Sequence, residues 1–261
     1  GLPNSPDGVR LRHAQLRAAS DARLRFTASL ASPCSGLDLA VLLAAEEHLT
    51  GSVDNIISQV DSSLETLSAA VRARLALSKA YGSDFNDPRT IATAVSTTLF
   101  GSSGAPDDSD DAFFAGSAQA SYYDPLNSFV DQVLNRRVGI PITLSLIYNG
   151  CCERLGLPMV GLNAPSHLLV APKDTTVPFV VDPFDGGAIL DIDAAAALVA
   201  RNARMRFDVS GGTLMEGDMQ RGRILLEMLR RRPMQEHAWC ARMLRNLRGI
   251  HAAAGDVVRT L

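Results

Sequence analysis

Two side chains in the second half of the chain have the chemistry of an acyl-transfer site. His167 lies in the segment NAPSHLLV, at the expected start of a strand, and Asp182 ends the next predicted strand in FVVDPFDGG. Neighbouring antiparallel strands would bring them together, so that the carboxylate orients the imidazole as in a nucleophile–histidine–aspartate triad. Because a histidine and an aspartate 15 residues apart are common, a buried hydrogen bond that stabilises helix-on-sheet packing is the competing interpretation.

The nucleophile of such a triad is expected at the start of a helix upstream. Residues 139–145 read GIPITLS, and Pro141 suits the first position of a helix that runs to about Leu155. The free N–H groups and the dipole of a helix N-terminus lower the pKa of a cysteine placed there. This position holds proline, and Cys151 and Cys152 lie about 15 Å further along the helix.

Other polar residues near the helix start are candidates for binding. Thr143 and Ser145 carry hydroxyl groups, but a hydroxyl in the first turns more simply caps the helix or bonds its backbone. Asn163 is expected in a loop of the same cleft. Arg136 and Arg137 precede the helix, where either guanidinium could clamp an acidic group or form a surface ion pair. The candidate binding residues are therefore Asn163, Arg136, Arg137 and Thr143.

The elements that would position these residues form a helical first half and a mixed second half. Apolar residues recur at helical spacing from residue 36 to 79, and residues 90–100 add a short helix. Residues 192–203 and the tail from Gln220 are again helical. Apolar runs bounded by proline and glycine predict three strands, at residues 159–162, 167–171 and 178–182. We therefore predict an α+β protein.

These patterns divide the chain into four segments: an N-terminal helical region at 1–100, an acidic loop or insertion at 101–118, a core at 119–210 and a helical tail at 211–261. Phe113 and Phe114 are apolar exceptions within the insertion, and we expect them to pack locally. The end of the tail, MLRNLRGIHAAAGDVVRTL, has the rhythm of a tetratricopeptide helix pair.

Composition and charge exclude several classes of protein. Of the 261 residues, 46% are hydrophobic and 20% charged, which allows a substantial core. No run of about 18 apolar residues occurs, so we expect no membrane span. The four cysteines lack metal-ligand spacing, and we expect a reducing compartment and neither metal nor cofactor. The net charge of −3 does not favour nucleic acid. An arginine cluster is expected to form a solvated helix face: Arg221, Arg223, Arg230, Arg231 and Arg232.

The beginning of the chain has a local excess of positive charge. Residues 9–25 hold five arginines against a single acid, Asp21, and the chain begins at Gly1. This composition is typical of the region that follows an organellar transit peptide, and a basic first helix is the alternative. We expect a chloroplast or another organelle stroma or matrix, with the cytoplasm as the alternative.

Five segments of the chain together resemble a known family. They read, in order, DLAVLLAAEEHL, SYYDPLNSFVDQVLNRRVGIPITLSLIY, ERLGLPMVGLNAPSHLLV, VVDPFDGG and MLRNLRGIHAAAGD. They are similar to the bacterial SirB-type proteins and their plant and algal relatives, over residues 36–261. The resemblance implies a helical N-terminal region, a transglutaminase-like core and a tetratricopeptide-like tail. In that core a papain-like helix packs on a small antiparallel sheet, here expected within residues 122–190.

The resemblance also identifies a missing nucleophile. Transglutaminase-like enzymes carry Gly-x-Cys at the start of this helix, whereas this chain has GIP, with Pro141 at the nucleophile position. His167 and Asp182 match the family's histidine and aspartate. We therefore expect a non-catalytic protein-binding or assembly factor, whose partners are one or more proteins up to a large complex. The alternatives are a hydrolase or amidase that uses His167 and Asp182 without a cysteine, and an RNA-binding factor that acts through the C-terminal arginines.

Overall fold

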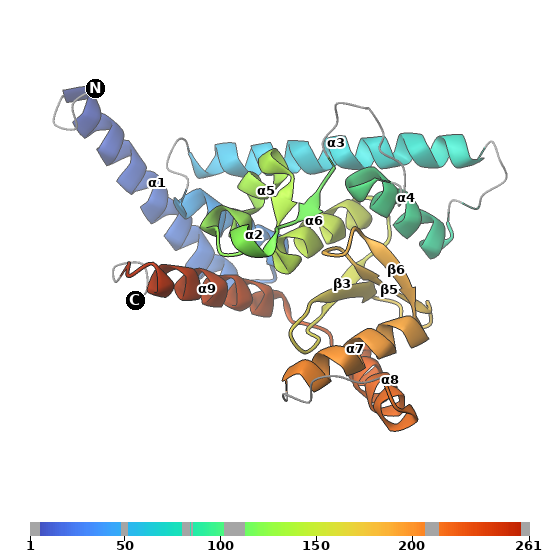
Figure 1. Cartoon of the computed structure of the whole chain (residues 1–261). Coiled ribbons are helices and arrows are strands. Elements are labelled where there is room, and N and C mark those ends of the chain that lie inside the picture. The colour runs from blue at the N-terminus through green and yellow to red at the C-terminus, as the bar shows by residue number, and fades with distance from the viewer. Residues whose placement is uncertain are drawn as a thin grey trace. The chain divides into compact units, whose positions relative to one another are not determined.

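The computed structural model describes residues 6–47, 52–79, 84, 86–101, 113–206 and 214–256 (Figure 1). In chain order the elements are α1 (Pro6–Leu30), α2 (Gly36–Glu47), α3 (Val53–Lys79), α4 (Pro88–Phe100), β1 (Ala115–Gly116), η1 (Gln119–Ser121), η2 (Pro125–Ser128), α5 (Val130–Arg136), β2 (Val138–Gly139), α6 (Pro141–Arg154), β3 (Met159–Leu162), β4 (Leu169–Pro172), β5 (Phe179–Asp182), β6 (Ala188–Asp191), α7 (Ile192–Arg206), α8 (Glu216–Arg231) and α9 (Glu236–Ala253). The four aspartates of the predicted insertion lie outside the described residues.

Contacts within the chain define two compact units, and each is assembled from distant segments. The first comprises Gly1–Ser63, Tyr123–Arg136 and Gln235–Leu261, and the second comprises Leu64–Tyr122 and Arg137–Met234. Helix α3 contributes residues to both units. The candidate triad residues Pro141, His167 and Asp182 all belong to the second unit.

The first unit is a helical cluster around α2. The sequence of α2, GLDLAVLLAAEE, is apolar on almost every side, so the helix is buried on most of its surface. Helices α1, α5 and α9 pack on it. Gly36 permits the close approach of α9, because a Cβ there would lie 2.8 Å from the Trp239 ring. The Gly36 N–H also donates to Oε2 of Glu236 at 2.7 Å, which joins the starts of α2 and α9.

The second unit contains a four-stranded antiparallel sheet in the order β3-β4-β5-β6. Each strand pairs with its neighbour in sequence, so the connections are short. Helix α6 packs on β3 and β4, whereas α7 packs on β5 and β6, and α8 packs on α7. In Figure 1, α6 and α7 lie on opposite sides of the sheet.

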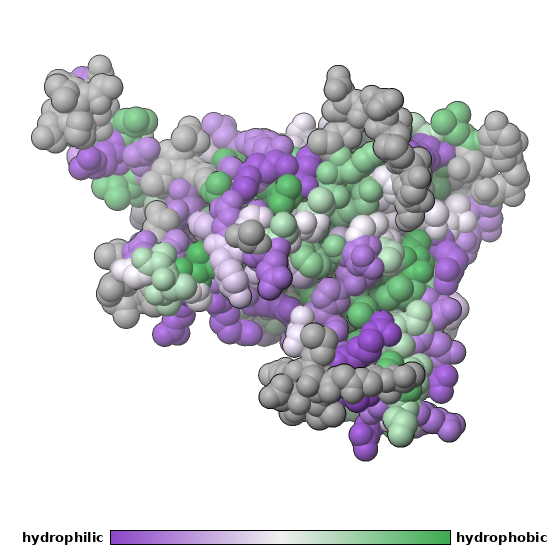
Figure 2. All heavy atoms as spheres, in the orientation of Figure 1, coloured by the Kyte–Doolittle hydropathy of each residue, from purple (hydrophilic) through white to green (hydrophobic). Residues whose placement is uncertain are grey.

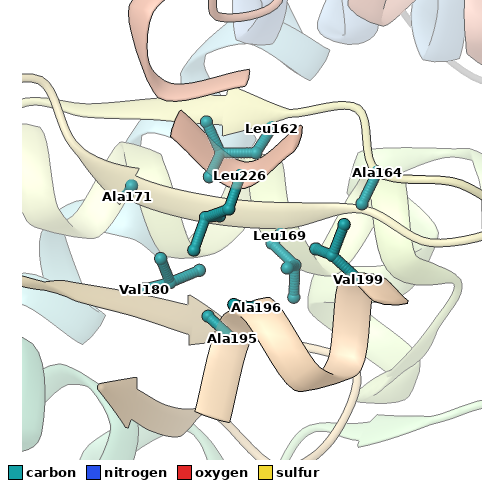
Figure 3. Close-up of a cluster of buried hydrophobic side chains, with 9 residues drawn as sticks. All are labelled: Leu162, Ala164, Leu169, Ala171, Val180, Ala195, Ala196, Val199 and Leu226. Carbon is teal, nitrogen blue, oxygen red and sulfur yellow. The ribbon is translucent and has the colours of Figure 1, made fainter. Parts of the chain in front are cut away.

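The face of the sheet under α7 is closed by an apolar cluster (Figure 3). Leu169 and Ala171 are two residues apart on β4, so both side chains point to this face. The cluster contains residues in or next to the strands, in α7 and in α8: Leu162, Ala164, Leu169, Ala171, Val180, Ala195, Ala196, Val199 and Leu226. Gly222 brings α8 close to α7, since a Cβ there would lie 2.3 Å from the carbonyl oxygen of Ala196. The sheet, α7 and α8 therefore share one apolar core.

The predicted α+β class is confirmed, with differences in detail. The three predicted strands are present, but β4 begins at Leu169, so His167 lies in the turn before it. A fourth strand, β6, was not predicted, because four residues directly after Gly186 and Gly187 carry too little periodic signal. Asp191 then caps α7, as its Oδ1 accepts the N–H of Ala194 at 2.7 Å.

Phe114 and Arg230 each bear on a sequence-based expectation. Phe114 was expected to pack locally, and it is only 3% exposed and packs edge-on against Phe100, at 6.5 Å between ring centroids. Arg230 was expected on a solvated face. Its side chain is instead buried and donates to the carbonyl oxygens of Thr175 at 2.9 Å and Val177 at 2.7 Å. Arg230 therefore ties α8 to the β4–β5 connection.

Helix α1 contains the basic residues of positions 9–25. Its exposed apolar side chains include Val9, Leu11 and Leu16, and hydrophobic and hydrophilic residues lie side by side on this helix in Figure 2. Across the described ranges, the structure contains no helix that is both long enough and apolar enough to cross a membrane.

Candidate functional site

The start of α6 is fixed by its own backbone and by a short parallel ladder. Ile140 is the N-cap in an extended conformation, and Pro141 occupies the first turn. The Thr143 hydroxyl accepts the N–H of Ile140 at 3.2 Å and lies 3.1 Å from its carbonyl oxygen. Just before the helix, Gly139 pairs with Gly116 across β1 and β2. The fully buried Thr143 side chain thus holds the N-cap in place.

His167 and Asp182 form a close pair beside the sheet. Nε2 of His167 lies 2.7 Å from Oδ2 of Asp182. The other carboxylate oxygen, Oδ1, accepts the backbone N–H groups of Phe184 at 3.1 Å and Asp185 at 3.2 Å. Val170 pairs with Val181, so the antiparallel register brings the turn before β4 opposite the turn after β5. The imidazole is therefore oriented by a carboxylate that is itself anchored to backbone.

The Phe184 ring connects this pair to the start of α6. Its centroid lies 6.3 Å from that of His167 and 6.3 Å from that of Tyr122, both in edge-to-face geometry. Phe184 also packs on Gly116, where an added Cβ would lie 2.8 Å from the ring. Since Gly116 pairs with Gly139, two residues before Pro141, the structure brings the helix start and the His167–Asp182 pair into one neighbourhood.

Backbone strain occurs at two residues that flank this neighbourhood. Ser166, directly before His167, has a φ of 54°, and Arg137, directly before β2, has a φ of 59°. The left-handed region is costly for residues other than glycine and is maintained only where the surroundings require it. At Ser166 it turns the chain so that His167 faces Asp182.

The thiol and hydroxyl groups of the second unit do not complete a triad. Among the described residues, none of them forms a hydrogen bond with His167. The hydroxyl groups of Ser117 and Ser145 are buried and have no hydrogen-bond partner in the described part of the chain. Burial raises the pKa of the Cys151 thiol to about 12 and that of Cys152 well above its ordinary value. Both thiols are therefore protonated and poor nucleophiles near neutral pH.

The candidate binding residues have separate environments. Arg136 belongs to the first unit, where it pairs with Asp124 at 2.7 Å. The Arg137 guanidinium lies over the Phe114 ring at 4.4 Å from its centroid, which is a cation–π contact. Asn163 is exposed directly after β3 and takes part in a contact within the chain. Within the ranges that the structure covers, no three His, Cys, Asp or Glu side chains are grouped to hold a metal ion.

Comparison with known families gives a match over most of the chain. A family described as the Transglutaminase-like superfamily matches residues 58–245. The chain belongs to this superfamily. The match includes α6, the His167–Asp182 pair and the whole sheet, so the transglutaminase-like core predicted from the sequence is confirmed. No solved structure gives a significant match.

Similar proteins occur in bacteria and animals. A UPF0162 protein of Xylella fastidiosa is 35% identical over 132 residues, which is 50% of this chain and 42% of the relative. A UPF0162 protein of Vibrio cholerae is 37% identical over 89 residues, 33% of this chain and 32% of the relative. F-box only protein 21 of Mus musculus is 35% identical over 89 residues, 31% of this chain but only 14% of the relative. This transglutaminase-like chain thus spans less than half the length of these curated relatives.

Proposed function

We propose that this protein is a non-catalytic protein-binding or assembly factor built on an inactive transglutaminase-like core. One observation carries the proposal: an oriented His167–Asp182 pair is linked, through Phe184 and the Gly116–Gly139 pairing, to a helix start that holds Pro141. Proline has no thiol or hydroxyl group, so it cannot form a covalent acyl-enzyme at the nucleophile position. Hydrogen-bonding groups of the site remain available to bind a partner.

Other potential nucleophiles give little support to covalent catalysis. The Thr143 hydroxyl is engaged with the Ile140 backbone, and Ser145 has no base bonded to it among the described residues. Because its pKa is raised, the Cys151 thiol stays protonated near neutral pH and does not supply a thiolate nucleophile. These contacts favour a binding role over acyl transfer.

The finer family assignment is also part of the proposal. We assign the chain to the SirB-type proteins, with the tail at residues 211–261 as the start of a tetratricopeptide-like region. In support, α9 is amphipathic and buries Trp239, Met243 and Leu247. At least three repeats are usually needed for a stable array, so a single helix pair must pack on other structure. Packing of α9 on α2 within the first unit satisfies that requirement.

Similarity to part of F-box only protein 21 is consistent with use of this core inside longer proteins, since the match covers 14% of that relative. For the compartment, we propose an organelle stroma or matrix such as that of a chloroplast, on the basis of the arginine-rich residues 9–25. The cytoplasm is the alternative.

A hydrolase or amidase is the second candidate function, because an oriented imidazole could activate water without a protein nucleophile. RNA binding has less support, as Arg230 is buried on carbonyl oxygens and Arg223 and Arg231 pair with Asp193 and Glu227.

The test is affinity purification of the tagged protein from its native source at near-physiological salt, followed by mass spectrometry. A protein that co-purifies in stoichiometric amount with the wild type, and is lost from His167→Ala, would support the proposal. Lys173→Ala is the matched control, because Lys173 is exposed directly after β4.

Retention of the partner by both variants would place the contact elsewhere on the surface. A monomer with no co-purifying protein would overturn the proposal. Peptide and amide hydrolysis that disappears in His167→Ala would instead establish the hydrolase.

A further inference from the structure

The hydrogen bonds of Asp182 determine which ring nitrogen of His167 carries the proton. Asp182 is 4% exposed, and its two oxygens accept from Phe184 N–H, Asp185 N–H and the imidazole. A carboxylate has no proton to donate, so it only accepts hydrogen bonds. Nε2 must therefore be the donor at 2.7 Å.

The other ring nitrogen then has a free lone pair. In a neutral imidazole one nitrogen donates and the other accepts, so Nδ1 is an acceptor when Nε2–H faces Asp182. Nδ1 has no hydrogen-bond partner among the described residues. The buried polar atoms without a partner do not include Nδ1, and the His167 side chain is 15% exposed. Nδ1 is therefore an accessible acceptor with a fixed orientation.

The immediate surroundings of this acceptor disfavour anions. The contacts to the imidazole are the negative carboxylate of Asp182 and the edge-to-face ring of Phe184, with Tyr122 beyond it. No ion pair of His167 with another residue occurs in the described part of the chain. An incoming carboxylate or phosphate would meet a lone pair and a nearby negative charge. An N–H or O–H group would meet a matched acceptor.

We propose that this site binds a hydrogen-bond donor, an N–H or O–H group of a partner, through Nδ1 of His167, and that it rejects anionic groups. The proposal rests on the proposed function, because it names the chemistry by which that site would hold its partner. Asp182 sets the specificity without touching the ligand, since it fixes the tautomer.

The tautomer itself is tested first, without any partner. Long-range ¹H–¹⁵N spectra of the whole protein labelled at histidine should show His167 protonated at Nε2 and unprotonated at Nδ1. In Asp182→Asn, the carboxamide N–H₂ would donate to Nε2 while its oxygen keeps the N–H groups of Phe184 and Asp185. The proton should then move to Nδ1. A wild-type ring protonated at Nδ1 would overturn the proposal.

Ligand preference is tested with acetamide and acetate, which are matched in size, at a pH where the same spectra show the ring neutral. Acetamide should shift the His167 Nδ1 signal of the wild type in a saturable way, and acetate should not. In Asp182→Asn the preference should reverse. No saturable response to acetamide, or an equal response to acetate, would overturn the proposal.

These measurements separate this inference from the proposed function. If no protein partner co-purifies but acetamide selectivity holds, the site binds donors and only the assembly role fails. If a partner binds equally well to wild type and Asp182→Asn, the assembly role survives and the donor site is not how the partner is held. Peptides and small amides, compared in the same titration, distinguish a polypeptide ligand from a free small molecule.

Discussion

A cysteine at position 141 should regain part of the reactivity that this site lacks. In Pro141→Cys, the new thiol would occupy the first turn of α6, where the backbone N–H groups are not used within the helix. The thiolate would be stabilised by the helix dipole and by the imidazole of His167, which could accept the thiol proton at Nδ1. We expect the pKa of this thiol to lie below that of an ordinary cysteine.

The size of the effect follows from the helix position. A favourable, partly buried charge at a helix end gains up to about 2 kcal/mol, which lowers a thiol pKa from about 8.5 to about 7. At pH 7 the ionised fraction then rises from about 3% to about 50%. Because nucleophilicity falls with pKa, at a Brønsted slope of about 0.4–0.5, the net gain in alkylation rate is about threefold at pH 7 and about sixfold at pH 6. Burial of position 141 opposes this gain, and the His167 contribution adds to it.

The assay is the pH profile of alkylation by iodoacetamide, in a Cys34→Ser background that removes the half-buried thiol. Ile142→Cys is the matched control, because it lies on the same turn but about 100° around the helix. Pro141→Cys combined with His167→Ala isolates the contribution of the imidazole.

The reasoning is refuted if the thiol of Pro141→Cys reacts no faster than free cysteine at pH 6 to 7. It is also refuted if removing His167 leaves the pH profile unchanged, since the helix start would then not face the imidazole.

Three further predictions concern stability and are measured by urea unfolding. Gly222→Ala should destabilise the protein by about 1–3 kcal/mol through overpacking against Ala196. Gly217→Ala is the control, because no atom lies within 4 Å of the added Cβ, and it should stabilise the protein by up to about 1 kcal/mol. Equal effects of the two substitutions would contradict the α7–α8 packing. Ser166→Val should cost about 1–3 kcal/mol because a β-branched residue is strained at a φ of 54°, and Ser166→Gly should escape that loss. The raised pKa of Cys151, about 12, means that the unfolded chain loses this proton first. The free energy of unfolding should therefore fall between about pH 9 and pH 12, at about 1.4 kcal/mol per pH unit for each such thiol. Cys151→Ser should remove the contribution of one thiol from that slope.

Local patterns were sufficient for much of the fold. The apolar spacing of residues 36–79 and the proline at position 141 predicted helices that are present as α2, α3 and α6. Strand β6 was missed, since four residues after two glycines carry too little periodic signal, and it is only pairing with β5 that makes them a strand. Phe114 was expected to pack locally, but only the tertiary structure identifies Phe100 as the ring it packs against.

For the site, the sequence alone determined which residues are chemically capable: His167 as a base, Asp182 as its partner, and a proline where a nucleophile would be expected. Tertiary structure decided how they are joined, because the orientation of a side chain depends on contacts between segments far apart in the chain. The anchoring of Asp182 by two backbone N–H groups and the position of Phe184 against Gly116 have no signature in local sequence. Nor does the left-handed turn at Ser166, which is held by its surroundings against its own preference.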